Sequence, residues 1–176
     1  MADKRKSPAL SVALVGMMAA TIECAKLALM ALPNIEVVTL LCALYGYVFG
    51  KRGILAAVVF VCIEPLIYGF NTWIISYFLY WPLVAFVFMM LGRAGVKNRF
   101  IIVGIAVGLT VWFGVLTSLV DVGLFTGQYD RFFYRFGVYY VRGVLFYALQ
   151  IACNAVVFFG FGFLSRLLQK RAKAFL

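Results

Sequence analysis

Residues 100–120 read FIIVGIAVGLTVWFGVLTSLV, a run of 21 residues without a charged side chain. A helix of about this length crosses the ~30 Å hydrocarbon core of a bilayer. The rest of the chain has the same character, because 66% of its 176 residues are hydrophobic, 12% are charged and the mean hydropathy is +1.05. A soluble domain is roughly half apolar and about a quarter charged. The sequence therefore predicts an all-α integral membrane protein, with residues 1–176 as a single membrane domain.

Charged residues, prolines and glycines divide the chain into six predicted transmembrane helices. Pro33 and Asn34 end the first apolar run, and a basic loop over 92–99 separates the fourth helix from the fifth. The second helix is short for a full crossing, so we expect its outer end to be buried in protein. A longer loop over 126–137 precedes the last helix. The predicted spans are residues 8–32, 35–50, 53–68, 72–91, 100–125 and 138–168.

The basic residues orient these six spans. With both termini on one side, that side carries twelve of the sixteen Lys and Arg residues. The positive-inside rule makes it the cytoplasmic side. The net charge of +10 then orients the protein at the membrane surface and requires no nucleic-acid partner. The twelve are Lys4, Arg5, Lys6, Lys51, Arg52, Arg93, Lys97, Arg99, Arg166, Lys170, Arg171 and Lys173.

Residue usage argues against enzymatic and metal chemistry. The chain has no histidine, which removes His-based catalytic groups and the usual ligands of zinc, iron and copper. Its four cysteines each stand alone in apolar sequence, so we expect buried thiols and neither a metal site nor a cofactor. An intramembrane aspartyl protease needs two converging aspartates, whereas only Asp121 lies in a predicted span and Asp130 lies in a loop. We expect a protein that is not an enzyme.

Several polar residues fall at membrane depth, where charges usually face a cavity or one another. Glu23 and Lys26 are three residues apart on the first helix and can pair on one face, either fixing helix packing or lining a ligand cavity. Glu64 precedes a proline in the third helix, with Tyr68 one turn later, and is predicted to face a cavity. Asn34 and Glu36 lie in the connection between the first two helices.

Two helices each show a stripe of candidate binding residues. On the last helix, a three-or-four-residue spacing places one set of side chains on a common face: Tyr139, Arg142, Phe146, Gln150 and Asn154. This face serves either interhelical hydrogen bonding or ligand binding. On the fourth helix a second set lies on one side: Trp73, Tyr77, Tyr80 and Trp81. It belongs either to the aromatic belt at the membrane interface or to a cavity.

The first helix begins with small residues at close intervals, namely Ala9, Ala13, Gly16 and Ala20. Small residues at this spacing allow two helices to approach closely in lipid. The face therefore packs either within the chain or against another membrane protein.

Taken with these features, the chain resembles a substrate-binding S component of an energy-coupling factor (ECF) transporter. The resemblance includes the small size, six spans with cytoplasmic termini and a basic head leading into Ala9-Leu-Ser-Val-Ala13. It also includes the segment 32–40, LPNIEVVTL, followed by Tyr45 to Gly50. It implies that the protein captures a vitamin or related micronutrient at a bacterial plasma membrane. A transmembrane scaffold subunit and two cytoplasmic ATPases, all separate chains, would drive the import.

The resemblance also implies where ligand and partner bind. The scaffold would dock on Ala9 and Ala13, with an extension to Gly16 and Ala20. The ligand would bind in the outer half, closed by residues 33–36 and 126–137. Cobalamin is the first candidate, with pyridoxal, pantothenate and queuosine-type precursors as alternatives. The expected substrate-binding residues are Asn34, Glu36, Glu64, Tyr68, Trp73, Tyr77, Tyr139, Arg142, Gln150 and Asn154.

Other classes of membrane protein stay open. A small channel, or a structural subunit of a larger membrane complex, is the main alternative. A secondary transporter with inverted repeats is disfavoured because the two halves of the sequence do not mirror one another.

Overall fold

The computed structural model describes residues 8–32, 35–125 and 130–172. These residues form seven α-helices, one π-helical turn and one 3₁₀ turn, and contain no strand, which confirms the all-α class. The elements are α1 (Pro8–Ala28), α2 (Val38–Phe49), α3 (Lys51–Tyr68), α4 (Thr72–Arg93), α5 (Arg99–Val120), η1 (Asp121–Phe125), α6 (Phe132–Val157), η2 (Phe158–Gly160) and α7 (Phe161–Ala172).

Four helical segments are long and apolar enough to cross a membrane. They are α1, α4, α5 together with η1, and the helical run from α6 through α7. The other two helices are less clear candidates. α2 has only 12 residues, and α3 carries Lys51 and Arg52 at its start and Glu64 near its end. The long apolar helices agree with an integral membrane protein.

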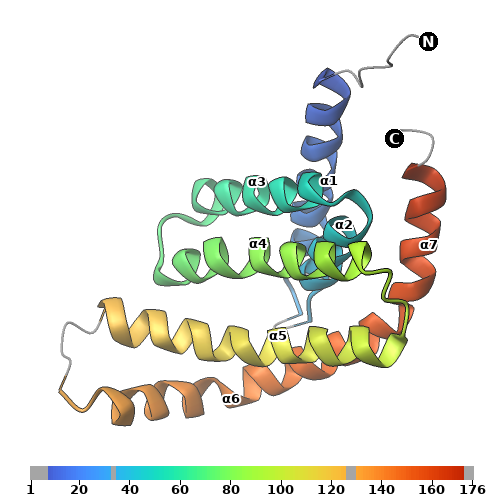
Figure 1. The fold of residues 1–176 in the computed structure, drawn as a ribbon. Coiled ribbons are helices and arrows are strands. Elements are labelled where there is room, and N and C mark those ends of the chain that lie inside the picture. The colour runs from blue at the N-terminus through green and yellow to red at the C-terminus, as the bar shows by residue number, and fades with distance from the viewer. Residues whose placement is uncertain (1–7, 33–34, 126–129, 173–176) are drawn as a thin grey trace, which may run out of the picture.

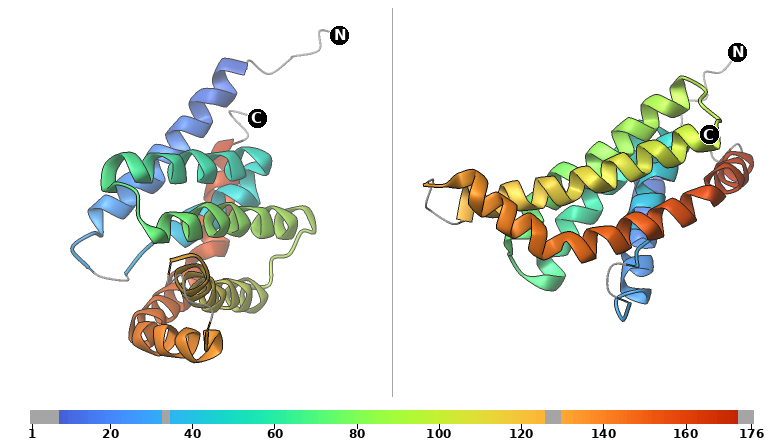
Figure 2. Two further views of the ribbon diagram at one scale, coloured as in Figure 1. Left: turned by 90° about the vertical axis from the view of Figure 1, so that its left-hand side faces the viewer. Right: turned by 90° about the horizontal axis from the view of Figure 1, so that it is seen from below.

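The helices form two packed groups (Figure 1). α3 and α4 lie side by side, α2 packs against both, and α1 crosses behind α3 at a steep angle. α5 and α6 form an antiparallel pair on the other side of α4. The further views in Figure 2 show the same separation, with α7 turned away from the direction of α6.

Helix α2 is the most buried of the helices and packs closely against α4. Its first turns are buried, with Val38 and Thr39 at 2% and 0% exposure, which confirms the expectation that this short helix begins inside the protein. Gly46 allows α2 to approach α4 closely, because a Cβ at this position would stand 2.0 Å from the carbonyl oxygen of Ala85. An ordinary side chain cannot be placed there without moving backbone.

The last predicted span differs from the structure at both ends. α6 begins at Phe132, so residues 132–137, expected in a loop, are helical. The predicted helix over 138–168 is also interrupted by η2, after which α7 turns aside (Figure 1). The reason is local packing: Phe158 and Phe161 are both buried, their rings stack at 5.7 Å, and both contact the ring of Phe88 on α4. Gly160 within η2 and Gly162 just after it also weaken the helix at this point.

Basic side chains gather at one end of the helices. The turns that join α2 to α3 and α4 to α5 lie at the same end in Figure 1, where α7 also begins. These turns and the exposed part of α7 contain the following described cations: Lys51, Arg52, Arg93, Lys97, Arg99, Arg166, Lys170 and Arg171. None of the five described acidic residues lies in these turns or in α7. The five acidic residues are Glu23, Glu36, Glu64, Asp121 and Asp130.

Candidate functional site

A cavity of about 270 Å³, open along a rim that includes the exposed Met30 and Leu32, lies where the α1–α2 connection meets α3, α4, α5 and α6. Its walls combine three kinds of side chain. The end of α1 and the connection to α2 supply an aliphatic rim, the central helices supply aromatic rings, and three polar side chains complete the lining. The lining consists of Leu29, Met30, Leu32, Ile35 and Val38, then Phe60, Tyr77, Trp81 and Phe113, and finally Lys26, Glu36 and Gln150.

The aromatic wall is continuous from α4 to α5. The ring of Tyr77 lies 5.5 Å from that of Trp81 and 6.1 Å from that of Phe113, and the rings of Trp81 and Phe113 are 6.0 Å apart. Tyr80 is fully buried behind this wall. The aromatic stripe predicted on α4 thus faces the interior for these residues and does not serve only as an interfacial belt. Such a wall offers ring faces and edges to a planar ligand.

Lys26 closes one side of the cavity with an ion pair. Its ammonium group pairs with the Glu64 carboxylate on α3. The same nitrogen lies 4.3 Å from the ring centroid of Tyr68, 5.4 Å from that of Trp73 and 5.3 Å from that of Tyr77. Cation–π attraction and the ion pair therefore hold the ammonium in one place.

This arrangement corrects the predicted partner of Lys26. The sequence spacing suggested a pair with Glu23 on the same helix, whereas the structure pairs Lys26 with Glu64. Glu23 is buried nearby, and neither of its carboxylate oxygens has a hydrogen-bond partner among the described residues. The difference arises because packing of α1 against α3 brings a second carboxylate within reach, which spacing along one helix cannot reveal.

Glu36 and Asn154 join three helices beside the cavity. The Glu36 carboxylate accepts hydrogen bonds from the backbone N–H (2.9 Å) and hydroxyl (2.5 Å) of Thr39 at the start of α2. Asn154 Nδ2 donates to Glu36 Oε1 at 3.2 Å and to Thr110 Oγ1 on α5 at 3.0 Å. Asn154 therefore makes interhelical hydrogen bonds and does not line the cavity, whereas Glu36 does both.

Gln150 differs from Asn154 because it lines the cavity. It lines the cavity from α6, is only 7% exposed, and makes no hydrogen bond to any described residue. Its amide is therefore free to bond to water or a ligand in the cavity. In the same lining, Trp81 Nε1 is buried without a hydrogen-bond partner among the described residues, which costs free energy unless water or a ligand satisfies it. These two side chains are the clearest candidates for a ligand contact.

The remaining predicted site residues lie elsewhere. Tyr139 and Arg142 are exposed on α6 and do not belong to the lining, and the same holds for Phe146. Glu64, Tyr68 and Trp73 lie behind Lys26 and contact its ammonium group. Asn34 lies outside the described residues. Of the ten expected residues, the structure thus brings Glu36, Tyr77 and Gln150 into the cavity lining.

Sequence reasoning missed part of the lining. Lys26 carries a signal, since it is the sole lysine or arginine within the first predicted span and its face is open to a role in a ligand cavity, although it is not among the ten expected binding residues. Phe60 and Phe113 carried none, because each is one phenylalanine among 18. They line the cavity only because α3 and α5 pack against α4.

The small residues of α1 form an exposed stripe. Ala9, Ala13, Gly16 and Ala20 are all exposed, and a Cβ at Gly16 would meet no atom within 4 Å. The helix buries the opposite side instead, including Val15, Met18 and Ile22. Packing within the described part of the chain therefore does not explain the stripe.

The described residues bring together no group of three Cys, Asp or Glu side chains that could bind a metal ion. Comparisons of the chain with protein-family models, with curated proteins and with solved structures gave no match.

Proposed function

We propose that this chain is the substrate-capture S component of an ECF-type transporter that imports a vitamin or related micronutrient. The cavity carries the proposal, because Trp81 Nε1 in its aromatic wall is buried without a hydrogen-bond partner among the described residues and the Gln150 side chain lines it from α6. The resemblance in the segment 32–40 and at the start of α1 supports this choice of family. ATP hydrolysis belongs to separate partner chains.

The cavity favours a compact ring as ligand. Small-molecule sites usually measure about 300–1,000 Å³, and this one has about 270 Å³. A single heteroaromatic ring, as in pyridoxal, fits such a space and can stack on Tyr77 and Trp81. Cobalamin, the first candidate from the resemblance, has a macrocycle that would require the α1–α2 connection and α6 to move apart.

The exposed stripe on α1 supports an external partner. A transmembrane scaffold subunit that packs on Ala13 and Gly16 would bury a surface that is otherwise free of contacts. In this proposal the chain crosses a bacterial plasma membrane six times, with its basic end in the cytoplasm.

Co-purification from the native host tests both parts of the proposal. The full chain is purified in mild detergent and examined by native mass spectrometry for a bound small molecule and for partner chains. Gln150→Leu should reduce ligand occupancy by about tenfold, since one hydrogen bond in a buried site is worth about 1–1.5 kcal/mol, while the partners stay bound. Ala13→Leu should leave the ligand bound and reduce recovery of the partner chains, because the larger side chain blocks close helix approach.

Val12→Leu is the control for the docking variant, since Val12 is 72% exposed on α1 outside the stripe. Normal recovery of scaffold and ATPases with Ala13→Leu would contradict the docking surface. A wild-type chain that carries no ligand, recruits no ATPase and forms a homo-oligomer would favour the channel or structural-subunit alternative.

A further inference from the structure

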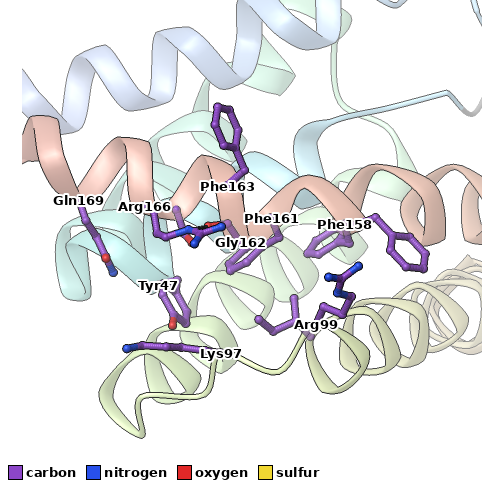
Figure 3. Close-up of a pocket in the computed structure, with 12 residues that line it drawn as sticks. Tyr47, Lys97, Arg99, Phe158, Phe161, Gly162, Phe163, Arg166 and Gln169 are labelled. Carbon is purple, nitrogen blue, oxygen red and sulfur yellow. Dashed lines mark hydrogen bonds between the residues drawn. The ribbon is translucent and has the colours of Figure 1, made fainter.

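A second cavity of about 500 Å³ opens at the basic end of the protein and shares no lining residue with the first one (Figure 3). Its floor consists of Tyr47, Ile102, Phe158 and Phe161, and its walls come from the start of α5 and from α7. Tyr47 is held in place because its hydroxyl donates to the carbonyl of Val96 at 2.9 Å. The cavity thus rests on the same aromatic packing that bends the chain at η2.

Three cations line this cavity, and no described carboxylate does. They are Lys97 and Arg99 from the α4–α5 turn and Arg166 from α7. None of them forms an ion pair with a described residue, and Arg166 Nε donates only to the carbonyl of Gly162, at 2.9 Å. Three like charges around one cavity repel each other, and a bound anion would relieve this repulsion.

The rim of the cavity is apolar. Phe159 and Phe163, which also line it, are 55% and 67% exposed, and Phe100 beside Arg99 is 72% exposed. Exposed phenylalanines next to cations, at the end of apolar helices, match the border between headgroups and acyl chains. A ligand with an anionic head and an apolar tail would satisfy both surfaces at once.

We infer that this cavity binds a phosphate group, and that its source is the headgroup of an anionic phospholipid. The guanidinium groups of Arg99 and Arg166 bind the phosphate oxygens, with Lys97 as a third cation. The acyl chains lie along the exposed phenylalanines of η2 and α7. A soluble phosphate has the same head chemistry but gains nothing from the apolar rim.

Lipid titration of the delipidated full chain tests this inference by native mass spectrometry in detergent. Phosphatidylglycerol should bind at least about tenfold more tightly than phosphatidylcholine with the same acyl chains. The double variant Arg99→Gln/Arg166→Gln should lose about tenfold or more of the phosphatidylglycerol affinity, since hydrogen bonds to charged groups contribute about 1.5–3 kcal/mol each. Arg99→Lys/Arg166→Lys should keep part of it.

Lys51→Gln/Arg93→Gln is the matched control, because it removes the same charge from exposed positions at the same end, outside the cavity. It should bind phosphatidylglycerol within about twofold of the wild type. Tryptophan fluorescence on heating, without added lipid, checks that each variant is folded.

Equal affinity for the two lipids, or full binding by the Arg99→Gln/Arg166→Gln variant, would overturn the inference. Stabilisation by inorganic phosphate or glycerol phosphate that equals the effect of phosphatidylglycerol would overturn the lipid as the source. Neither result depends on whether the chain captures a vitamin.

Discussion

Lys26 is the residue on which the interior of the protein depends most directly. Its ammonium pairs with Glu64, which is fully buried, and keeps only 23% side-chain exposure itself. Removing one partner of such a pair leaves the other as an uncompensated charge, which commonly costs about 3–5 kcal/mol. Removing both charges together avoids that cost.

Lys26→Met and Glu64→Gln should therefore each lower the free energy of unfolding by about 3 kcal/mol, toward the lower end because Lys26 retains some exposure. The double variant should lose clearly less than the sum of the two single losses. Reversible denaturation in mixed micelles measures all three, with Lys170→Met on exposed α7 as control. Additive losses would show that the pair contributes no coupling.

For single residues, the sequence predicted which side chains of a helix face inward but not which partners they contact. Periodicity on the last helix correctly grouped Gln150 and Asn154 on an inward face, because spacing along one helix fixes direction. It could not separate Gln150, which opens to the cavity, from Asn154, which bonds to Glu36 and Thr110. It also extended the face to Arg142, which is exposed, because each four-residue step turns by about 40° around a helix of 3.6 residues per turn and three steps separate Arg142 from Asn154.

Among the elements, the contact between α2 and α4 is the least tolerant of change. Gly46→Ala places a methyl group against the backbone oxygen of Ala85, and backbone cannot yield as a flexible side chain does. Overpacking of this kind costs about 1–3 kcal/mol. We expect a lower unfolding temperature in detergent, followed by tryptophan fluorescence.

Gly108→Ala on α5 is the matched control for this substitution. A Cβ at Gly108 meets no atom within 4 Å, so the change should be neutral or stabilise the helix by up to about 1 kcal/mol. If the two variants unfold at the same temperature, the close approach of α2 and α4 does not limit stability.

Helix boundaries could be predicted where a glycine or a group of basic residues interrupts the apolar sequence. The turn after Gly69 and the basic loop before Arg99 both appear at the predicted places. The interruption at η2 carries only a weak signal in the sequence, because the residues around it contain no proline but include Gly160 and Gly162. Burial of Phe158 and Phe161 against α4 adds a tertiary contribution that the sequence does not reveal.

For the whole molecule, the separation of charge makes a topological prediction. The basic turns lie at one end of α3, α4 and α5, and Asp121 and Asp130 lie at the end of the α5–α6 pair opposite to those turns (Figure 1). In a variant without native cysteines, Asp130→Cys should react with a membrane-impermeant maleimide on intact cells. Lys97→Cys should react at least about tenfold less until the cells are opened. Reaction of both from the same side would exclude the six-span topology.

The Lys26–Glu64 pair also has a consequence for the assembly of the helices. The two residues are 38 positions apart, so the pair can form only when α3 packs against α1. Along the chain, the acid nearest to Lys26 is Glu23, three residues earlier on the same helix. The structure nevertheless pairs Lys26 with the distant Glu64, so the ammonium group gains its partner from tertiary assembly and not from its own helix.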